Sequence, residues 1–322
     1  MEVHKTILDV IGNTPLVQLN KVSQGLKPTI LAKLEHLNPG GSVKDRIGIA
    51  MVEQAEQRGL LKPGGTIIEP TSGNTGVGLA MVASVKGYKM IFVMPDKMSE
   101  EKRSILRAYG AKVVITPTNV SPESAEHYTK VAERLSRETP HSYMPNQYEN
   151  RANPDAHYRA TGPEIWRQTN GKVDVLVCGM GTGGTITGIG RFLKEKKKNL
   201  KVVGADPEGS IFYPRYHRRK EEPHQYKVEG IGEDFMPGTM DLSIVDDVIQ
   251  VSDGDAFRMA RRLAQEEGIL VGGSGGTAVH AAVKVAEHLP EEKTIVTLLP
   301  DTGRNYLSKL FSDQWMKEQG FL

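Results

Sequence analysis

Short apolar strands alternate with helical segments along most of this chain, and glycine-rich corners join them. Thr66–Glu69 has the length and content of a buried strand, and Asp45–Arg58 before it carries apolar residues at helical spacing. Strands that alternate with helices in this way predict parallel sheets with helices on both faces. The sequence therefore predicts an α/β fold.

The same alternation continues towards the C-terminus. Further strands are expected at Lys89–Met94, Lys112–Thr116, Val173–Val177, Lys201–Asp206, Gly268–Val271 and Thr294–Leu299. Further helices are expected up to Gly87, from the N-cap Ser99 to Gly110, and at Pro122–Glu138, Thr185–Lys198 and Gly275–His288. The rhythm breaks between His141 and Pro163, so we place a junction between two α/β halves near Gln147, with a cleft between the halves as the natural ligand site.

Charge is nearly balanced, with 41 basic and 39 acidic residues and a net charge of +2. No global field therefore favours a nucleic acid or a membrane surface as a partner, and no apolar run is long enough to span a bilayer. Cys178, the only cysteine, lies in an apolar run, which indicates a buried thiol and excludes an internal disulfide. The histidines show no metal-ligand spacing. We expect a cytoplasmic protein without a metal.

One glycine-rich loop, Gly179–Thr185, stands between a predicted strand and a predicted helix. Successive glycines let backbone N–H groups surround an oxyanion, and the helix N-terminus adds positive partial charge. A single phosphate is one expected ligand. A dinucleotide is the other, because Gly179, Gly181 and Gly184 satisfy the G-x-G-x-x-G pattern and Asp206 ends the next strand.

Two other glycine-rich corners also precede helices. Thr71–Gly76 carries hydroxyl groups and the Asn74 amide, which suit a carboxylate; a helix N-cap explains one such residue but not the whole cluster. Ser274 lies in the other corner. A ligand-binding role and an ordinary helix N-cap role are equally consistent with its position there.

Lys44 follows a turn of Gly and Pro and begins a helical pattern. A lysine held by packed backbone is a candidate Schiff-base former, although alone it is one of 41 basic residues.

Taken in order, several segments resemble the pyridoxal-phosphate enzymes of the cysteine synthase and cystathionine β-synthase family. The segments are Ile11–Leu16, Gly40–Arg46, Glu69–Gly76 and Gly181–Thr185. The resemblance covers nearly the whole chain and implies a tryptophan-synthase-β-like enzyme of fold type II, with two open twisted α/β domains and the active site in the cleft between them. It implies a smaller N-terminal domain, residues 1–12 and 35–146, and a larger C-terminal domain, residues 13–34 and 147–322.

The resemblance implies pyridoxal 5'-phosphate as the cofactor, with Lys44 as its Schiff-base partner and as the catalytic group that moves the α-proton. The residues implied to hold the cofactor are Asn74 at the ring 3-oxygen, Ser274 at the ring nitrogen, Gly181, Thr182, Gly183, Gly184 and Thr185 at the phosphate, and Pro300 and Asp301. The residues implied to bind substrate are Thr71, Ser72, Gly73, Thr75, Gln147, Glu229 and Gly230. A hydroxyl at the ring nitrogen, in place of a carboxylate, favours β-elimination.

Three segments resemble the cystathionine β-synthase branch of the family: Asp206–Ser210, Val228–Phe235 and the chain end from Pro300. The resemblance therefore implies β-replacement on L-serine or O-acetyl-L-serine with L-homocysteine, giving L-cystathionine, and release of hydrogen sulfide from cysteine. The alternative is an O-acetylserine sulfhydrylase that uses sulfide. A nicotinamide-dependent oxidoreductase, built on Gly179–Gly184 and Asp206, is a remote alternative.

Two departures from the animal members of that branch concern regulation. The chain begins without their Cys- and His-bearing haem segment and ends without their C-terminal regulatory pair. We therefore expect no haem and no activation by S-adenosylmethionine. Glu233 stands where animal members carry an aromatic residue, which leaves the substrate detail of that loop open. The resemblance also implies a homodimer.

Overall fold

The computed structural model describes residues 3–71, 73–96, 98–121, 123–290 and 292–322. By its internal packing the chain divides into two compact units. Unit 1 is Met1–Ile11 with Asn38–Asn153, and unit 2 is Gly12–Leu37 with Pro154–Leu322. Each unit contains its own sheet and its own helices, so the predicted α/β fold is confirmed.

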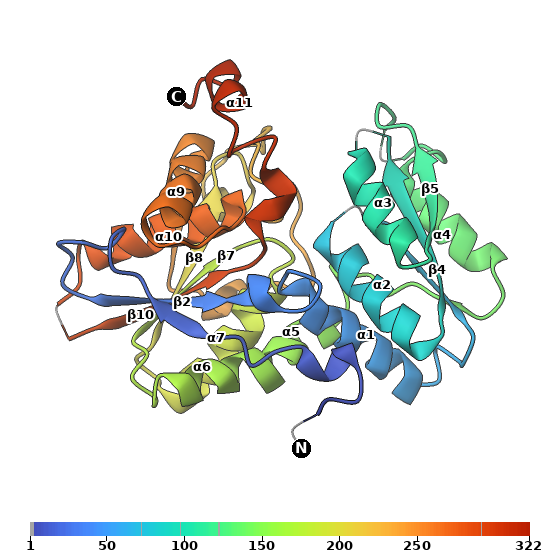
Figure 1. Ribbon diagram of the computed structural model, residues 1–322, viewed down its shortest axis with the longest axis horizontal. Helices are drawn as coiled ribbons and strands as arrows, with labels where there is room; N and C mark the ends of the chain where they lie inside the picture. The colour runs from blue at the N-terminus through green and yellow to red at the C-terminus, as the bar shows by residue number, and fades with distance from the viewer. Residues whose placement is uncertain (1–2, 72, 97, 122, 291) are drawn as a thin grey trace. The chain divides into compact units, whose positions relative to one another are not determined.

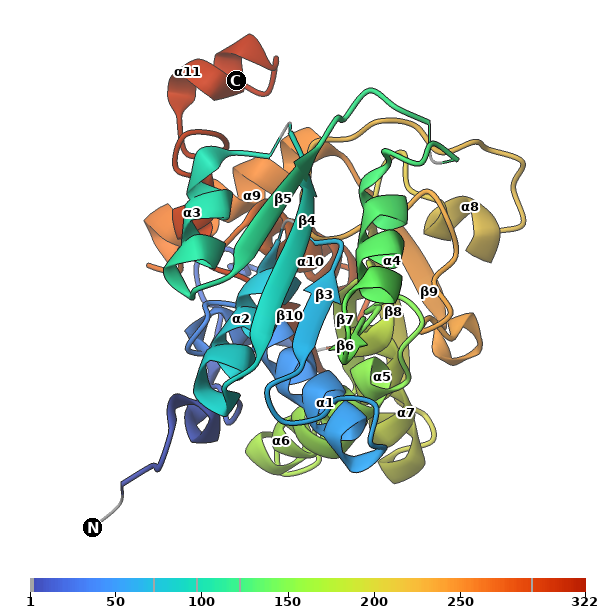
Figure 2. The same ribbon diagram turned by 90° about the vertical axis from the view of Figure 1, so that its right-hand side faces the viewer.

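Unit 1 is built on a four-stranded sheet in the order β5-β4-β3-β6, in which every pair of strands is parallel. Its strands are β3 (Thr66–Glu69), β4 (Lys89–Pro95), β5 (Lys112–Thr116) and β6 (Ser142–Tyr143). Its helices are η1 (Ile7–Val10), α1 (Lys44–Gln57), α2 (Asn74–Lys86), α3 (Glu100–Ala108) and α4 (Tyr128–Glu138). In Figure 2, α2 and α3 lie on one face of this sheet and α4 lies on the other. Every residue of β3 is buried because both faces are covered.

Unit 2 is built on a six-stranded sheet in the order β1-β2-β10-β7-β8-β9, in which only β1 is antiparallel to its neighbour. Its strands are β1 (Leu16–Gln18), β2 (Thr29–Leu34), β7 (Val175–Gly179), β8 (Lys201–Pro207), β9 (Asp247–Val251) and β10 (Thr294–Leu299). Its main helices are α6 (Gly162–Gln168), α7 (Gly184–Lys196), α8 (Phe212–Tyr216), α9 (Asp253–Glu266), α10 (Gly273–Ala286) and α11 (Asp313–Glu318). In Figure 1, α9 and α10 lie on one face of the sheet and α6 and α7 on the other.

Between these elements lie shorter turns of helix. They are α5 (Ala152–Ala156), the π-helical turn η3 (His157–Thr161), and the 3-10 turns η2 (Glu35–Leu37), η4 (Leu242–Ile244) and η5 (Gly303–Tyr306). The π-helical turn continues directly into α6, so α5, η3 and α6 form one helical path.

The core of unit 2 lies on both faces of its sheet. Val175 and Val177 of β7 pack in one apolar cluster, and Leu176 and Cys178 pack in another, because successive side chains of a strand point to opposite faces. The expectation of a buried Cys178 thiol is confirmed, since it is 1% exposed. Burial raises the pKa of the Cys178 thiol far above its usual value, so the thiol serves packing rather than chemistry.

Several predicted elements are confirmed with little change. The strands at Thr66–Glu69 and Lys112–Thr116 have the predicted bounds. Ser99 is the N-cap of α3, and its side chain accepts a hydrogen bond from the Lys102 N–H. These elements were predictable because buried parallel strands and capped helices carry strong local patterns.

One predicted strand is wrong, and one predicted helix begins later than expected. Gly268–Val271 is not a strand; only Val271 forms an isolated bridge, to Thr302, because the backbone N–H of Ile269 instead closes the end of α9 by bonding to the Leu263 carbonyl. The helix predicted from Pro122 begins at Tyr128. Pro122 lies outside the described residues, and residues 123–127 form turns in which the Ser124 hydroxyl accepts from the Glu126 N–H, a local bond that competes with helix.

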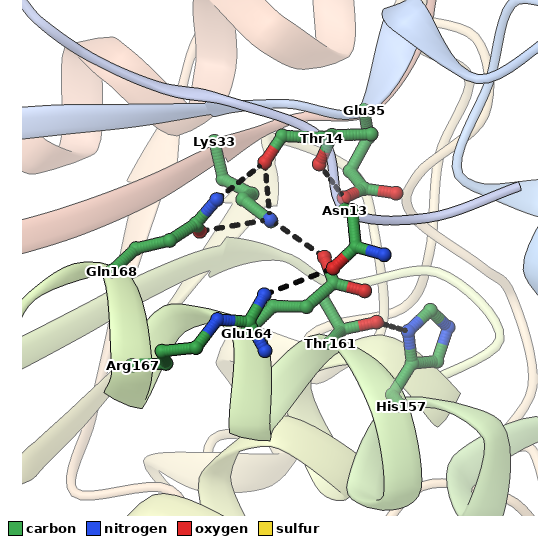
Figure 3. Close-up of polar contacts among 9 residues, drawn as sticks. All are labelled: Asn13, Thr14, Lys33, Glu35, His157, Thr161, Glu164, Arg167 and Gln168. Atoms are coloured by element: carbon green, nitrogen blue, oxygen red, sulfur yellow. Dashed lines mark hydrogen bonds and ion pairs between the residues drawn. The ribbon is translucent and has the colours of Figure 1, made fainter. Parts of the chain in front are cut away.

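The segment Asn13–Thr14 is anchored in unit 2 by a buried polar cluster (Figure 3). The Lys33 ammonium is 0% exposed and donates to the Thr14 carbonyl at 2.6 Å and to Glu164 at 2.7 Å. The Thr14 hydroxyl donates to Glu35 at 2.7 Å. Hydrogen bonds to several partners offset the cost of burying these charges. The first of the resembling segments therefore has a structural role: it ties the start of β1 to α6.

Candidate active site

Lys44 is the first residue of α1 and is partly buried. The turn before it is closed at Gly41, whose φ of 84° suits glycine and whose N–H donates to the Asn38 carbonyl at 2.8 Å. The Asp45 carboxylate accepts from the Gly40 N–H at 2.6 Å, and the Ser42 hydroxyl accepts from the Lys44 N–H at 3.2 Å. The backbone on both sides of the lysine is therefore fixed.

The helices α1 and α2 touch through their backbones. A Cβ added to Gly48 would lie 2.7 Å from the carbonyl carbon of Gly78, and one added to Gly78 would lie 2.7 Å from the Lys44 carbonyl oxygen. Gly78 is one helical turn after Asn74, the first residue of α2. The first turns of the two helices, which carry Lys44 and Asn74, therefore lie beside each other.

The corner before α2 gathers hydroxyl and backbone N–H groups at a helix start. Gly73 is the N-cap of α2 and makes no side-chain cap, so the N-cap alternative for Asn74 and Thr75 is wrong. Ser72 lies outside the described residues. Thr71 is buried, and its hydroxyl lies 3.4 Å from the Gly73 nitrogen, which donates to it. Backbone N–H groups at a helix start, with threonine hydroxyls beside them, suit an anion.

Gln147 belongs to the same site although it is far away in sequence. The Thr75 hydroxyl donates to the Gln147 side-chain oxygen at 2.6 Å. Beneath them lies Glu69, which ends β3 and is 2% exposed. Burial raises the pKa of Glu69 to about 7. The backbone N–H groups of Asn146 and Gln147, which donate to its carboxylate, act in the opposite direction and lower this pKa. Sequence reasoning assigned no role to Glu69, although a carboxylate at the end of an apolar strand was a signal.

In unit 2, the loop Gly179–Thr185 joins β7 to α7. Gly183 is the N-cap of α7 with φ 84°, and a Cβ there would lie 2.6 Å from the Met240 Cα. A Cβ on Gly181 would lie 3.1 Å from the Gly230 carbonyl oxygen. The loop is thus a tight cradle at the helix N-terminus: side chains at these glycines would press against the backbone at Met240 and Gly230. The backbone N–H groups of such a loop fit a phosphate group.

The segment around Gly230 holds the phosphate loop from the side. The Gly232 N–H donates to the Met180 carbonyl at 2.6 Å, and the Thr239 hydroxyl donates to the Thr182 carbonyl. Glu229, in the same segment, forms an ion pair with Lys309. The structure therefore brings the predicted Glu229–Gly230 segment and the predicted phosphate loop together within unit 2.

His157 is a further residue of this site that sequence reasoning missed. Its Nε2 lies 3.2 Å from the Thr185 hydroxyl, and its Nδ1 lies 3.0 Å from the Thr161 hydroxyl (Figure 3 draws the second contact). The π-helical turn His157–Thr161 places both contacts on one imidazole, and such turns are frequent at functional sites. No local sequence signal marks this turn.

Ser274 and Asp301 lie near the start of α10. Ser274 is 2% exposed; the N-cap of α10 is Gly272, so the N-cap role for Ser274 is wrong. Asp301 is buried and accepts from the Tyr306 hydroxyl at 2.6 Å, while its carbonyl accepts from the Gly272 N–H at 3.3 Å. Pro300, which follows β10, precedes it. The structure thus gathers Ser274, Pro300 and Asp301 around one helix start.

Asp206 has a structural partner that removes the basis for the dinucleotide alternative. It is 0% exposed, and its carboxylate accepts from the Tyr213 N–H of α8 at 2.8 Å. Burial raises the pKa of Asp206 to about 7. A carboxylate buried against α8 is not presented to a ribose, so a nicotinamide site on Gly179–Gly184 and Asp206 is not supported.

Within the described residues, no group of three or more His, Cys, Asp or Glu side chains could hold a metal ion. In the same part of the chain, no helix combines the length and apolar content that crossing a bilayer requires.

Comparison with known proteins identifies the family. The model of the family "Pyridoxal-phosphate dependent enzyme" matches residues 7–301. The chain is 54% identical to a cystathionine beta-synthase of Apis mellifera over 318 residues, which are 98% of this chain and 63% of that relative. It is 47% identical to a cysteine synthase of Staphylococcus aureus over 304 residues, which are 94% of this chain and 95% of that relative.

A solved structure confirms the fold. The O-acetylserine dependent cystathionine beta-synthase from Helicobacter pylori has a TM-score of 0.87 and 41% identity, covering 96% of this chain and 99% of the other. The chain spans less than two thirds of the length of its honeybee relative. The family match over residues 7–301, and a loop that fits a phosphate, agree on the cofactor. This chain belongs to the pyridoxal-phosphate dependent enzymes.

Proposed function

We propose that this chain catalyses a β-replacement. It removes the β-substituent of L-serine or O-acetyl-L-serine and joins the thiol of L-homocysteine in its place, giving L-cystathionine. The observation that carries the proposal is the position of Lys44: its backbone is packed against α2, beside the turn that holds Asn74 and Thr75. The similarity to the honeybee cystathionine beta-synthase supports homocysteine as the acceptor.

The cofactor supplies one element of the chemistry. Pyridoxal phosphate, when bound, provides an electron sink for the negative charge that develops at the substrate Cα. We assign its phosphate to Gly181, Thr182, Gly183, Gly184 and Thr185, its 3-oxygen to Asn74, its ring nitrogen to Ser274, and further contacts to Pro300 and Asp301. The tight glycine cradle and the start of α7 support the phosphate assignment.

The loop before α2 binds the substrate carboxylate in this proposal. The assigned residues are Thr71, Ser72, Gly73, Thr75 and Gln147, with Glu229 and Gly230 on the acceptor side. The contact of the Thr75 hydroxyl with Gln147 supports the grouping of these two residues. A carboxylate bound by several N–H and O–H donors fixes the orientation of the substrate Cα.

Lys44 moves the proton. Its amine takes the proton from the substrate Cα and, as an ammonium, gives it to the oxygen of the departing hydroxyl group. Acetate, a better leaving group, needs less of this help. The thiol sulfur then bonds to the substrate Cβ while the thiol proton passes to Lys44, and Lys44 returns that proton to Cα. With serine, the hydroxyl group leaves as water with the proton that came from Cα.

Steady-state rates with each pair of donor and acceptor test the proposal. Serine and O-acetylserine are each combined with homocysteine and with sulfide, and cystathionine and cysteine are measured directly. Homocysteine should support turnover with at least one donor, and Lys44→Ala should abolish it while Lys89→Ala, an exposed lysine on β4, should not. Turnover with sulfide but none with homocysteine would overturn the choice of acceptor.

The second candidate is an O-acetylserine sulfhydrylase, which makes cysteine from O-acetylserine and sulfide. It is favoured by the cysteine synthase of Staphylococcus aureus, of which this chain covers 95%. The same rates decide between the two candidates. With cysteine as the donor, sulfide is the leaving group, so hydrogen sulfide release accompanies either function.

We further propose a cytoplasmic homodimer. The single buried cysteine, which excludes an internal disulfide, supports a reducing compartment. The dimer rests on the family resemblance. Light scattering of the purified protein tests it, and a monomer at micromolar concentration would contradict it.

We also propose that the larger, C-terminal domain carries the phosphate loop and that the smaller, N-terminal domain carries Lys44.

A further inference from the structure

Glu69 is a buried carboxylate that the proposed chemistry leaves without a task. It ends β3 and is 2% exposed. One of its oxygens accepts from the Asn146 N–H at 2.9 Å and the other accepts from the Gln147 N–H at 3.2 Å. A carboxylate taken out of water costs free energy unless hydrogen bonds compensate it, so a purely apolar side chain would serve packing better.

The peptide that Glu69 binds has an unusual conformation. Asn146 has a φ of 52°, in the left-handed region that residues other than glycine rarely adopt. Such a residue persists where its surroundings hold it. The two hydrogen bonds to Glu69 hold the N–H groups on both sides of this turn, and they connect it to a central strand of the unit 1 sheet.

Three hydrogen bonds fix the position of Gln147, which follows Asn146 in this turn. Its N–H donates to Glu69, its carbonyl accepts from the Asn153 side chain at 2.8 Å, and its side-chain oxygen accepts from the Thr75 hydroxyl at 2.6 Å. With the side-chain oxygen facing Thr75, the Nε2 group of Gln147 is oriented as a hydrogen-bond donor.

We propose that Glu69 is a positioning residue for the donor amino acid: it holds Gln147 so that the Gln147 Nε2 donates to the substrate carboxylate beside Thr71 and Thr75. This inference rests on the proposed function, in which these residues form the carboxylate subsite. Glu69 acts through Gln147 and does not touch the substrate. Its loss therefore weakens binding of the donor amino acid more than it slows the proton transfer at Lys44.

Glu69→Gln is the informative variant. The amide has nearly the shape of the carboxylate, but its NH2 group faces a backbone N–H and cannot accept from it. We expect the KM for the donor amino acid to rise about tenfold, the size of one lost hydrogen bond, with kcat within about twofold of the wild type. Ile68→Val is the matched control: it is the preceding residue of β3, is 0% exposed and packs in the core. It should lower the thermal midpoint and leave the KM unchanged.

A double-mutant cycle with Gln147→Ala tests whether Glu69 acts through Gln147. If it does, the KM of the double variant equals that of Gln147→Ala alone. Two outcomes would overturn the inference and leave the proposed function intact. In the first, the KM increases of the two single variants multiply in the double variant. In the second, Gln147→Ala raises the KM but Glu69→Gln leaves it unchanged. An unchanged KM in Gln147→Ala would overturn the carboxylate subsite itself, and the inference with it.

Amide hydrogen exchange gives a readout that is independent of turnover. Exchange in the peptide that contains Asn146 and Gln147 should be faster in Glu69→Gln than in the wild type and in Ile68→Val. Equal exchange in all three proteins would contradict the inference. Should Glu69→Gln fail to fold, Glu69→Asp, which keeps the charge on a shorter side chain, should give the same cycle and the same faster exchange.

Discussion

Gly48 of α1 and Gly78 of α2 meet backbone to backbone, so neither position has room for a side chain: a Cβ added to Gly48 would lie 2.7 Å from the Gly78 carbonyl carbon. The same crossing places Gly78 against the Lys44 carbonyl oxygen. The position of the proposed catalytic lysine is therefore set by the absence of a methyl group on the neighbouring helix.

Gly78→Ala tests this relationship. The added methyl group must push the Lys44 carbonyl away, so we expect a loss of about 1–3 kcal/mol in the free energy of unfolding from overpacking. We expect kcat to fall at least tenfold, because displacement of the proton carrier slows proton transfer. Urea unfolding and steady-state rates measure both effects. Val85→Ala, at an exposed position of α2, is the control and should change kcat little.

Gly183→Ala tests the phosphate cradle. Alanine at φ 84° is strained, and its Cβ would lie 2.6 Å from the Met240 Cα, so the loop must move. We expect the dissociation constant for pyridoxal phosphate, measured by titration of the apoenzyme, to rise at least tenfold. Gly59→Ala is a matched control, because Gly59 has a φ of 68° with open space around its Cβ position. Equal affinity in the two variants would contradict a phosphate at this loop.

Lys33→Ala tests the cluster of Figure 3. The change leaves the Glu164 carboxylate, 7% exposed, buried without the cation that lies 2.7 Å from it. We expect a loss of about 3–5 kcal/mol in the free energy of unfolding, measured by urea titration. The double change Lys33→Met with Glu164→Leu should cost less than the sum of the single changes. Lys197→Ala, which breaks a partly exposed pair with Asp174, should cost less than about 1 kcal/mol.

The pKa of Asp206 predicts a pH dependence of stability. Burial raises the pKa of this carboxyl from 3.8 to about 7, so between these two pH values the folded chain binds more protons than the unfolded chain. Its contribution to stability therefore falls as the pH rises through this window. Asp206→Asn removes the titration while keeping an acceptor for the Tyr213 N–H. The thermal midpoint of the wild type, relative to that of Asp206→Asn, should increase from pH 8 to pH 5; a constant difference would disprove the shift.

Much of the fold was predictable because its central strands are apolar on both faces. β3 and β5 follow directly from their sequence, and the glycine corners mark where helices begin. β1, β2, β6 and β9 were missed. The short β1 exposes two of its three residues, so its pattern is weak. The strand predicted at Gly268–Val271 failed because apolar content cannot show that a backbone N–H already bonds to the end of a helix.

The candidate site was predictable only where its residues are neighbours in sequence. Thr71 to Thr75, and Gly181 to Thr185, form compact groups that chemistry alone singles out. Glu69 and His157 contact Gln147 and Thr185, and only the folded chain creates these contacts. Long-range contacts of this kind leave no periodic trace, so a single sequence does not reveal them.

The pairing of β2 with β10 has a consequence for how the chain is made. Thr29 pairs with Thr294, whereas Asn38–Asn153 in unit 1 form a continuous stretch of sequence between β2 and β7. During synthesis on the ribosome, unit 1 can pack as soon as that stretch has emerged, while β2 waits for almost the entire chain before its parallel partner exists. We therefore expect nascent chains to protect unit 1 from proteolysis early and unit 2 only after release.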